Sequence, residues 1–295
     1  TFEVSCDGAD ELFVTAATGG REALGQVTAR AVDRLRSTGG EVLAQRVFTG
    51  SLSPTPDPVL QEADWPVTLL RTDPGVAPDC TQIHAVRGAA VERVFRRGRP
   101  VASVYEDGGA RWCRMGALGP EEGSTWAEDQ AGETFEEIQS VLHEAGMGPR
   151  NLVRTWFYLD DILSWYGDFN RVRDSFFARH GVYDGVVPAS TGIGMGNAAG
   201  ASLAAEALAL QPTGVEVRAV DSPLQCSAMS YGSAFSRAVE VQGSTHSRLY
   251  VSGTASLDGD GRTMCRDNFA GQMERTLEVA AEILRTRGMG WEDVV

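Results

Sequence analysis

One acidic side chain, Glu206, lies in an otherwise apolar run, LAAEALAL, and is the first candidate for acid–base chemistry. A carboxyl group among alanines and leucines must be ion-paired, solvated or raised in pKa. A raised pKa would make Glu206 a catalytic proton donor near neutral pH. The alternative is a structural carboxylate, on a polar face or in an ion pair at a subunit interface. The sequence leaves both roles open.

Two arginines in strand-like segments are candidates for binding a substrate carboxylate: Arg154 in VRTWFYL and Arg237 in FSRAVEV. A guanidinium group matches a carboxylate with two parallel hydrogen bonds. The alternative for Arg154 is a salt bridge at a sheet edge. Three further side chains are candidates for lining the pocket or for hydrogen-bonding a polyoxygenated ring, with core, turn or strand roles as the alternative: Tyr158, Tyr231 and Thr254.

The glycine-rich stretch PASTGIGMGNAAG, residues 188–200, contains a match to the dinucleotide-binding pattern G-x-G-x-x-G/A. That pattern works only between a buried parallel strand and the start of a helix. Here Pro188 interrupts the short preceding run, and the following ASLAAEALAL also alternates as a strand does. We therefore predict no dinucleotide, and expect the glycines to let the backbone approach a ligand or a neighbouring chain. The candidate substrate-binding residues of this stretch are Ser190, Thr191 and Gly192.

The composition excludes several classes of partner and site. The chain has 295 residues, a net charge of −14 and a pI of about 4.8, which disfavours nucleic acid and anionic membranes as partners. Five cysteines without a C-x-x-C pair and four isolated histidines predict neither disulfides nor a metal site. No apolar run approaches about 18 residues, so no membrane span is expected. These features predict a cytoplasmic protein without a metal or organic cofactor, in which a small anionic substrate would need a local cluster of arginines.

An internal repeat sets the positions of these candidates. The segments QAGETFEEIQSVLHEAGMG (130–148) and QMERTLEVAAEILRTRGMG (272–290) align without gaps, and both are amphipathic helices that end in glycine. Around the first helix the pattern predicts a β-β-α-β-α-β-β unit over residues 87–212. The second unit, 220–295, stops before its closing strands. We therefore expect a longer natural chain or a neighbouring subunit that covers the gap. Residues 1–86 fit neither copy and predict a small β-α-β-type module.

The unit 87–212 resembles the Rid (YjgF-like) superfamily, and the tandem arrangement resembles its chorismatase-like subgroup. The resemblance is in the order and spacing of several short segments, which are VRTWFYLDDI, DFNRVRDSFF, VPASTGIG, AAEALAL, FSRAVEV, LYVSGTAS and WEDVV. It implies an α+β fold of two tandem chorismate-mutase-like α/β sandwich domains, which assemble as a homotrimer, a trimeric pseudo-hexamer, with pockets between neighbouring domains.

The resemblance also implies a function, with one departure from the superfamily pattern. Rid deaminases carry an arginine directly after P-A, and this chain has Ser190 there, which makes deamination of imino acids doubtful. Glu206 falls at the position of the Rid glutamate, although the acid of chorismatases lies in the terminal strand of the second domain. We predict a chorismatase-like enzyme of secondary metabolism that releases pyruvate from chorismate or a related carboxylated cyclic enol ether. The alternatives are a Rid-like deaminase or hydrolase of a reactive imine or enamine, and a non-catalytic Rid-like binding protein.

Overall fold

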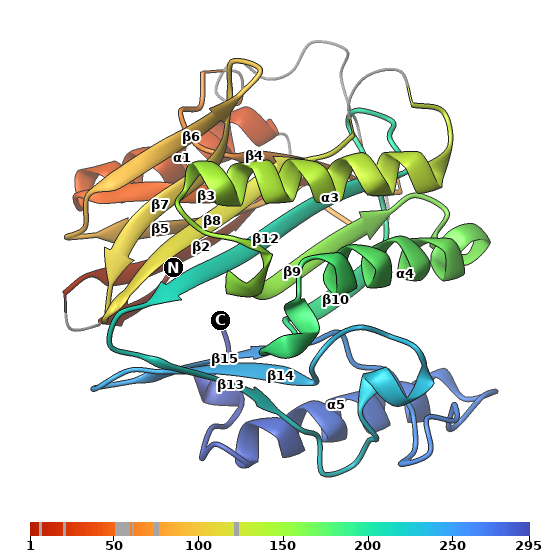
Figure 1. The fold of residues 1–295 in the computed structure, drawn as a ribbon. Helices are drawn as coiled ribbons and strands as arrows, with labels where there is room; N and C mark the ends of the chain where they lie inside the picture. Colours follow the sequence, from red (N-terminus) through yellow and green to blue (C-terminus); the bar gives the residue numbers. More distant parts are fainter. Residues whose placement is uncertain (6–7, 20–21, 51–59, 61, 74–76, 121–123) are drawn as a thin grey trace.

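The computed structural model describes residues 1–295 except 6–7, 20–21, 51–59, 61, 74–76 and 121–123. Its strands form two six-stranded sheets and one three-stranded sheet, and the helices lie on the outer faces of these sheets (Figure 1). No helix of the described segments is long and apolar enough to cross a membrane. The predicted mixed α+β fold class is confirmed.

The first Rid-like domain is a six-stranded sheet in the order β10-β9-β12-β8-β7-β6. Helices α3 (Ala127–Glu144) and α4 (Ile162–Arg179) cover one face of this sheet (Figure 1). The core between helices and sheet is aromatic: the Phe135 ring lies 5.0 Å from that of Phe176 and 5.5 Å from that of Phe157. The strands are β6 (Val91–Arg96), β7 (Arg99–Asp107), β8 (Ala110–Leu118), β9 (Leu152–Leu159), β10 (Ala189–Gly194) and β12 (Leu203–Pro212).

The glycine-rich stretch forms strands and not a phosphate-binding turn. Its first half is β10, which runs parallel to β9 at the edge of the sheet. Two of its later residues form β11 (Gly196–Asn197), which pairs with β4 (Val67–Arg71) of a different sheet. The following segment is the strand β12 and no helix, as its alternating pattern indicated. The stretch therefore joins the first Rid-like domain to the N-terminal module.

The N-terminal module is larger than the β-α-β-type unit expected from sequence. Five of its strands have the order β1-β2-β5-β3-β4, and one described helix, α1 (Leu24–Ser37), covers them. This is the strand order of β7-β8-β12-β9-β10, including the parallel pair β3/β4 that matches β9/β10. The module thus repeats the sheet topology of the first Rid-like domain. Its other strands are β1 (Phe2–Ser5), β2 (Asp10–Ala17), β3 (Gly40–Thr49) and β5 (Cys80–Arg87), so Arg87 belongs to this sheet.

The C-terminal unit contains a three-stranded sheet, β13-β14-β15, with helix α5 (Phe269–Arg285) on its outer face (Figure 1). The strands are β13 (Glu216–Val220), β14 (Ala238–Gln242) and β15 (Ser247–Val251). Helices α3 and α5 correspond to the two repeat segments that align in the sequence. The unit begins a few residues earlier than expected, because β13 already belongs to its sheet.

The three sheets meet at a shared core. Leu43 of β3, Trp112 of β8 and Val239 of β14 are fully buried in one apolar cluster. The face of the first Rid-like sheet that points away from its helices is therefore covered by the N-terminal module and the C-terminal unit of the same chain. This face is therefore not free to form the interface of the predicted homotrimer.

Candidate anion-binding cleft

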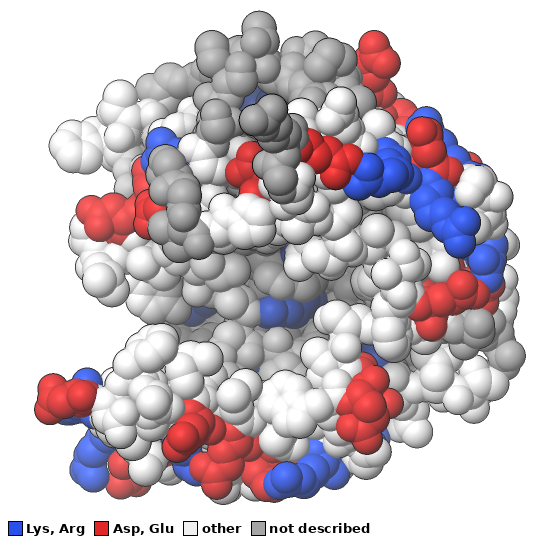
Figure 2. Space-filling model, turned by 180° about the vertical axis from the view of Figure 1, so that it is seen from behind, with Lys and Arg blue, Asp and Glu red and all other residues white. Residues whose placement is uncertain are grey.

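A cleft separates the C-terminal unit from the rest of the molecule. Figure 2 shows this hollow from behind, with basic side chains on its floor. These side chains are arginines, because the sequence contains no lysine. In a chain of net charge −14, such an inward-facing group of arginines marks a local site for an anion.

Arg154 of β9 is a buried cation that lacks a carboxylate partner among the described residues. It is 6% exposed, its Nη1 donates to the Thr155 carbonyl at 3.1 Å, and its Nη2 donates to Thr191 Oγ1 at 2.6 Å. The pKa of Arg154 is lowered to about 9, mainly by burial and also by the nearby Arg46 and Arg114, while Tyr158 opposes the shift. A buried guanidinium without a counter-ion is stabilised by binding an anion.

Three arginines surround the ring of Trp156. The guanidinium carbons of Arg46, Arg154 and Arg114 lie 4.5, 4.6 and 4.9 Å from the ring centroid. At these distances each cation is attracted to the π-electrons of the indole. Arg154 and Trp156 point to the same side of β9 because side chains two residues apart share a face of a strand. The indole thereby holds three positive charges close together.

Glu206 neutralises two of these three arginines. Its Oε2 accepts from Arg46 Nε at 2.8 Å and from Arg114 Nη2 at 2.5 Å, and the residue is 1% exposed. Burial alone would raise the pKa of Glu206, but Arg46 and Arg114 outweigh it and lower the pKa to about 2. A carboxylate with this pKa has no proton to donate at neutral pH. The geometry therefore favours the ion-pair alternative, with a partner in the N-terminal module and not in another subunit.

The second carboxylate oxygen of Glu206 can accept a hydrogen bond that the described residues do not supply. Glu206 Oε1 is buried and has no hydrogen-bond partner among the described residues. The nearby phenol of Tyr158 is buried on the same face as Trp156, and burial together with Glu206 raises its pKa. Leaving a buried acceptor without a donor costs about 1–3 kcal/mol. A ligand with a hydroxyl group would supply that donor beside the cation of Arg154.

Strand β10 connects this site to the C-terminal unit. The Ser190 backbone N–H donates to Ser252 Oγ at 2.9 Å, and the Gly253 N–H donates to the Ser190 carbonyl at 3.0 Å. The Ser190 hydroxyl accepts from Thr155 Oγ1 at 2.9 Å and supplies no positive charge. Thr254 Oγ1 donates to the Ser252 carbonyl at 3.1 Å. Of the predicted residues, Thr191 is thus the one that contacts Arg154.

Glycine is needed in β10 for contact with its own chain. A Cβ atom at Gly192 would lie 3.3 Å from the Tyr166 ring, and one at Gly194 would lie 2.9 Å from Ile162 Cγ2. Both neighbours belong to α4, which packs closely against the strand. These two glycines therefore allow close packing against helix α4 of the same chain, and not the predicted approach to a ligand or a neighbouring chain.

Arg237 occupies a second buried position, at the start of β14. It is 4% exposed, and its Nε and Nη2 donate to the Cys226 carbonyl at 2.9 and 2.8 Å. Its guanidinium carbon lies 5.4 Å from the ring centroid of Tyr231, which is partly exposed on a short 3-10 helix. No contact joins Arg237 to Arg154 among the described residues. The structure thus pairs the predicted Arg237 and Tyr231 with each other, apart from the Trp156 group.

Two residues of the site, Arg46 and Arg114, were not among the sequence candidates. Arg46 lies in the segment EVLAQRVFTG of β3, and Arg114 in ARWCRMGAL of β8. Each lies in a strand-like run that contains a second charge, Glu41 in the first and Arg111 in the second. The signal that singled out Glu206 and Arg154, one charge in an apolar run, therefore does not identify Arg46 or Arg114, and only the fold pairs them with Glu206.

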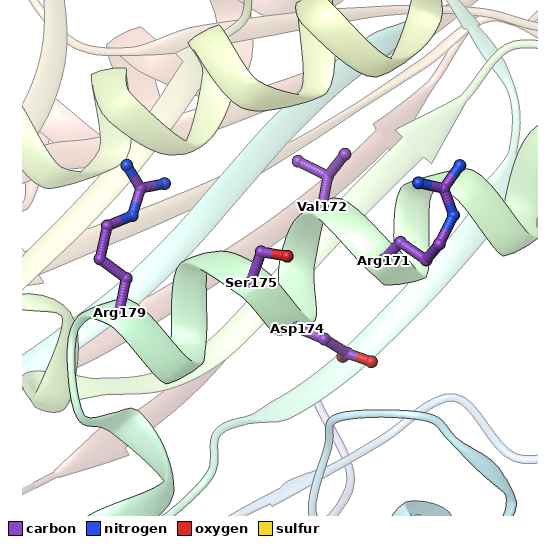
Figure 3. Close-up of a pocket in the computed structure, with 5 residues that line it drawn as sticks. All are labelled: Arg171, Val172, Asp174, Ser175 and Arg179. Atoms are coloured by element: carbon purple, nitrogen blue, oxygen red, sulfur yellow. The ribbon is translucent and has the colours of Figure 1, made fainter.

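A separate surface depression lies on α4, away from this cluster. It is lined by Arg171, Val172, Asp174, Ser175 and Arg179 (Figure 3). Its arginines are already paired across the helix interface, Arg171 with Glu128 and Arg179 with Glu136. It therefore offers no unpaired cation for a ligand. Within the described part of the chain, His, Cys, Asp and Glu side chains form no group that could hold a metal ion.

Comparisons with known proteins agree with this architecture. The family model described as Endoribonuclease L-PSP matches residues 116–219. A crystal structure of a chorismatase superposes with a TM-score of 0.64 at 19% identity, covering 97% of this chain and 82% of that one. No curated protein sequence matches the chain significantly.

Two single-domain structures match a smaller part of the chain. TdcF from E. coli, solved with bound serine, has 18% identity and a TM-score of 0.32, covering 37% of this chain and 85% of that one. A member of the YjgF protein family from Neisseria meningitidis has 20% identity and a TM-score of 0.35, covering 41% and 95%. The resemblance to the Rid (YjgF-like) superfamily is confirmed: residues 116–219 match its family model, and the chain as a whole has the tandem fold of a chorismatase.

Proposed function

We propose that this protein is a chorismatase-like enzyme, which releases pyruvate from chorismate or a related carboxylated cyclic enol ether. The observation that carries the proposal is Arg154, a buried guanidinium without a carboxylate partner among the described residues. It lies where the first Rid-like domain meets the C-terminal unit. A substrate carboxylate would complete this ion pair and offset the cost of burying the charge.

The neighbouring groups suit the remainder of such a substrate. Glu206 Oε1 is the buried acceptor that a ring hydroxyl would satisfy, and the indole of Trp156 offers an apolar surface. Thr191 Oγ1 accepts a hydrogen bond from Arg154 Nη2 and so positions the guanidinium. Arg46 and Arg114 keep Glu206 ionised, so that it accepts hydrogen bonds and donates none. In this proposal Glu206 orients the substrate, and the proton comes from another group.

The Rid-like deaminase alternative has less support from the site. Deamination of an imino acid requires a cation at the position of Ser190, and that hydroxyl is hydrogen-bonded to Thr155. The non-catalytic alternative predicts that the cleft binds no enol ether at all. One experiment separates the three: the purified protein is incubated with chorismate and, in parallel, with an imino acid generated in situ. Pyruvate release from chorismate supports our proposal, ammonia release supports deamination, and the absence of both supports the binding protein.

We also propose that the protein forms a homotrimer and that it is located in the cytoplasm. The face of the first sheet that points away from its helices is packed against the N-terminal module and the C-terminal unit. A trimer must therefore form through another surface of the chain. Light scattering at micromolar concentration tests this: a mass near 95 kDa, about three times the 31.6 kDa chain, supports the trimer, and a mass near 32 kDa contradicts it.

A further inference from the structure

Strand β10 carries side chains that extend the arginine site towards an apolar end. Cβ atoms at Gly192 and Gly194 would point at helix α4. Because side chains alternate along a strand, Thr191 and Ile193 point to the opposite face of the sheet. The hydrogen bond between Thr191 and Arg154 lies on that face. Ile193 therefore belongs to the surface that holds the arginines, and not to the core under the helices.

The strand register arranges this face of the sheet in rows. Thr191 of β10 is paired with Trp156 of β9, and Glu206 of β12 is paired with the same tryptophan. In the next row, Ile193 is paired with Tyr158. Two residues along a strand span about 7 Å, so this second row lies about 7 Å beyond the tryptophan. It extends the site in the direction that leads away from the buried guanidinium.

Apolar side chains gather around the second row. Four partly buried side chains pack here against a buried cluster that includes Tyr158, and these are Phe48, Trp156, Ile193 and Met195. Phe48 comes from β3, so the N-terminal module contributes to this end of the site as well. All four side chains keep part of their surface exposed, which leaves them accessible to a ligand. Small-molecule sites combine mostly apolar walls with a few polar groups, and the two rows together provide both.

We propose that Phe48, Ile193 and Met195 form an apolar wall that selects the ring of the substrate, an inference that rests on the function proposed above. A ring carboxylate binds at Arg154 and one ring hydroxyl donates to Glu206 Oε1, while the ring edge that carries only C–H groups packs on the apolar wall. The substrate class is thus an unsaturated six-membered ring acid with one free hydroxyl group. A second hydroxyl on the far edge would be buried at Ile193 without a hydrogen-bond partner, which lowers the affinity.

Binding of unreactive ring acids tests this selectivity without any turnover. The probes are 3-hydroxybenzoate, which offers the carboxylate and one hydroxyl, and 3,5-dihydroxybenzoate, which adds a second hydroxyl on the opposite edge. We expect the wild type to bind 3-hydroxybenzoate about 10- to 100-fold more tightly, which is the usual discrimination of an apolar pocket against an added hydroxyl. Calorimetry measures both dissociation constants. Equal affinity for the two acids would overturn the inference.

Ile193→Thr assigns the selectivity to the apolar wall. Threonine keeps a β-branched side chain, which suits a strand, and places a hydroxyl group beside the ring. The preference for 3-hydroxybenzoate should fall to about 3-fold or less, because the second ligand hydroxyl gains a partner. Ile193→Val adds no hydroxyl and should keep the preference.

Val91→Thr is the matched control. Val91 is a partly buried side chain of β6, at the opposite edge of the same sheet, and its replacement should leave the preference at the wild-type value. Thermal melting shows whether the variants fold. A lower melting temperature of Ile193→Thr with an unchanged preference would assign Ile193 to packing alone and overturn the inference. Because the comparison of the two acids uses the wild type, the proposal stays testable if a variant fails to fold.

Turnover separates this inference from the proposed function. In the pyruvate assay, Ile193→Thr should raise the KM for chorismate about 3- to 10-fold and leave kcat within about 2-fold, because the apolar wall contacts the ring and not the reacting bond. If the wild type releases pyruvate but binds both ring acids equally, the apolar wall is refuted and the function stands. If the wild type releases no pyruvate yet binds the two acids with the expected preference, the proposed function fails and the selectivity of the apolar wall is supported.

Discussion

The Arg46 Nε–H donates to Glu206 Oε2 at 2.8 Å, across 160 residues of sequence and between two different sheets. Arg46 belongs to the N-terminal module, and Glu206 belongs to the closing strand of the first Rid-like domain. The ion pair is buried, and Arg114 makes the second pair to the same oxygen. The N-terminal module is therefore part of the candidate site, and its removal would leave Glu206 and Trp156 exposed.

Replacing Glu206 tests whether it is structural. We expect Glu206→Gln to lower the unfolding free energy by about 3–5 kcal/mol, because two buried guanidinium groups lose their shared carboxylate. Glu92→Gln, whose carboxyl is exposed in a surface pair with Arg111, should change it by less than about 1 kcal/mol. Urea denaturation measures both. An unchanged unfolding free energy together with a lower kcat would instead restore Glu206 as the proton donor.

Low pH should lower the free energy of unfolding, because Glu206 becomes protonated. The pKa of Glu206 is about 2 in the folded protein and near 4.5 without its partners, so the unfolded state takes up the proton first. This contribution to stability is fully present above about pH 4.5 and is lost as pH falls towards 2. Denaturation between pH 6 and pH 2.5 should show a decline that is smaller in Glu206→Gln. Equal declines in both proteins would contradict the assignment.

Arg154→Met should separate binding from stability. We expect substrate affinity to fall about 30-fold or more, because a charge-assisted contact is lost. Stability should stay level or increase, since the variant no longer buries a cation without a carboxylate partner. Arg171→Met, at an exposed position of α4, is the control and should leave affinity unchanged. Calorimetry and thermal melting report the two quantities, and a destabilised variant with normal affinity would refute the role.

The affinity of the wild type should also depend on alkaline pH. The pKa of Arg154 is about 9, so the guanidinium loses its charge as pH rises through that value. Anion binding should weaken between pH 8 and pH 10 in the wild type, and Arg154→Met should lack that change. Titration of an unreactive dicarboxylate at several pH values provides the measurement. A wild-type affinity that is constant to pH 10 would show that Arg154 keeps its charge over this range.

Gly253→Ala tests the contact between β10 and the C-terminal unit. A Cβ atom there would lie 3.0 Å from Thr191 Cγ2 and 3.4 Å from its Cα, so Thr191 must move. Because Thr191 holds Arg154, we expect KM to rise about 3- to 10-fold while the chain still folds. Gly132→Ala in α3 has no atom within 4 Å of the new Cβ and should only strengthen the helix. The same KM in both variants would place the substrate elsewhere.

Removal of metal ions should leave turnover unchanged. The proposed reaction uses proton transfer and ion pairs, and the sequence has no cluster of cysteines and histidines at ligand spacing. Dialysis against EDTA followed by the pyruvate assay is the measurement. Loss of activity that zinc or magnesium restores would require a metal-assisted mechanism.

The sequence by itself determined the local elements and the repeat of the first Rid-like domain. Hydrophobic periodicity placed α3, α4, β9 and β12, because a helix and a strand each impose their own spacing on apolar side chains. A single charge in an apolar strand singled out Glu206 and Arg154. The same reasoning found only part of the N-terminal module. Strand β1 has only four residues, and β5, CTQIHAVR, mixes polar and apolar side chains on both of its faces.

Only the tertiary structure decided which charges meet. Strand order and the packing of one sheet on another bring Arg46 to Glu206, and Glu11 to Arg248, and neither is encoded in local spacing. The pKa shifts follow from those contacts: two arginines lower the pKa of Glu206 against the effect of burial, and burial together with Asp107 raises the pKa of Glu11. The pKa values of these two buried glutamates thus shift in opposite directions, because the balance of desolvation and neighbouring charge is set only when the sheets close together.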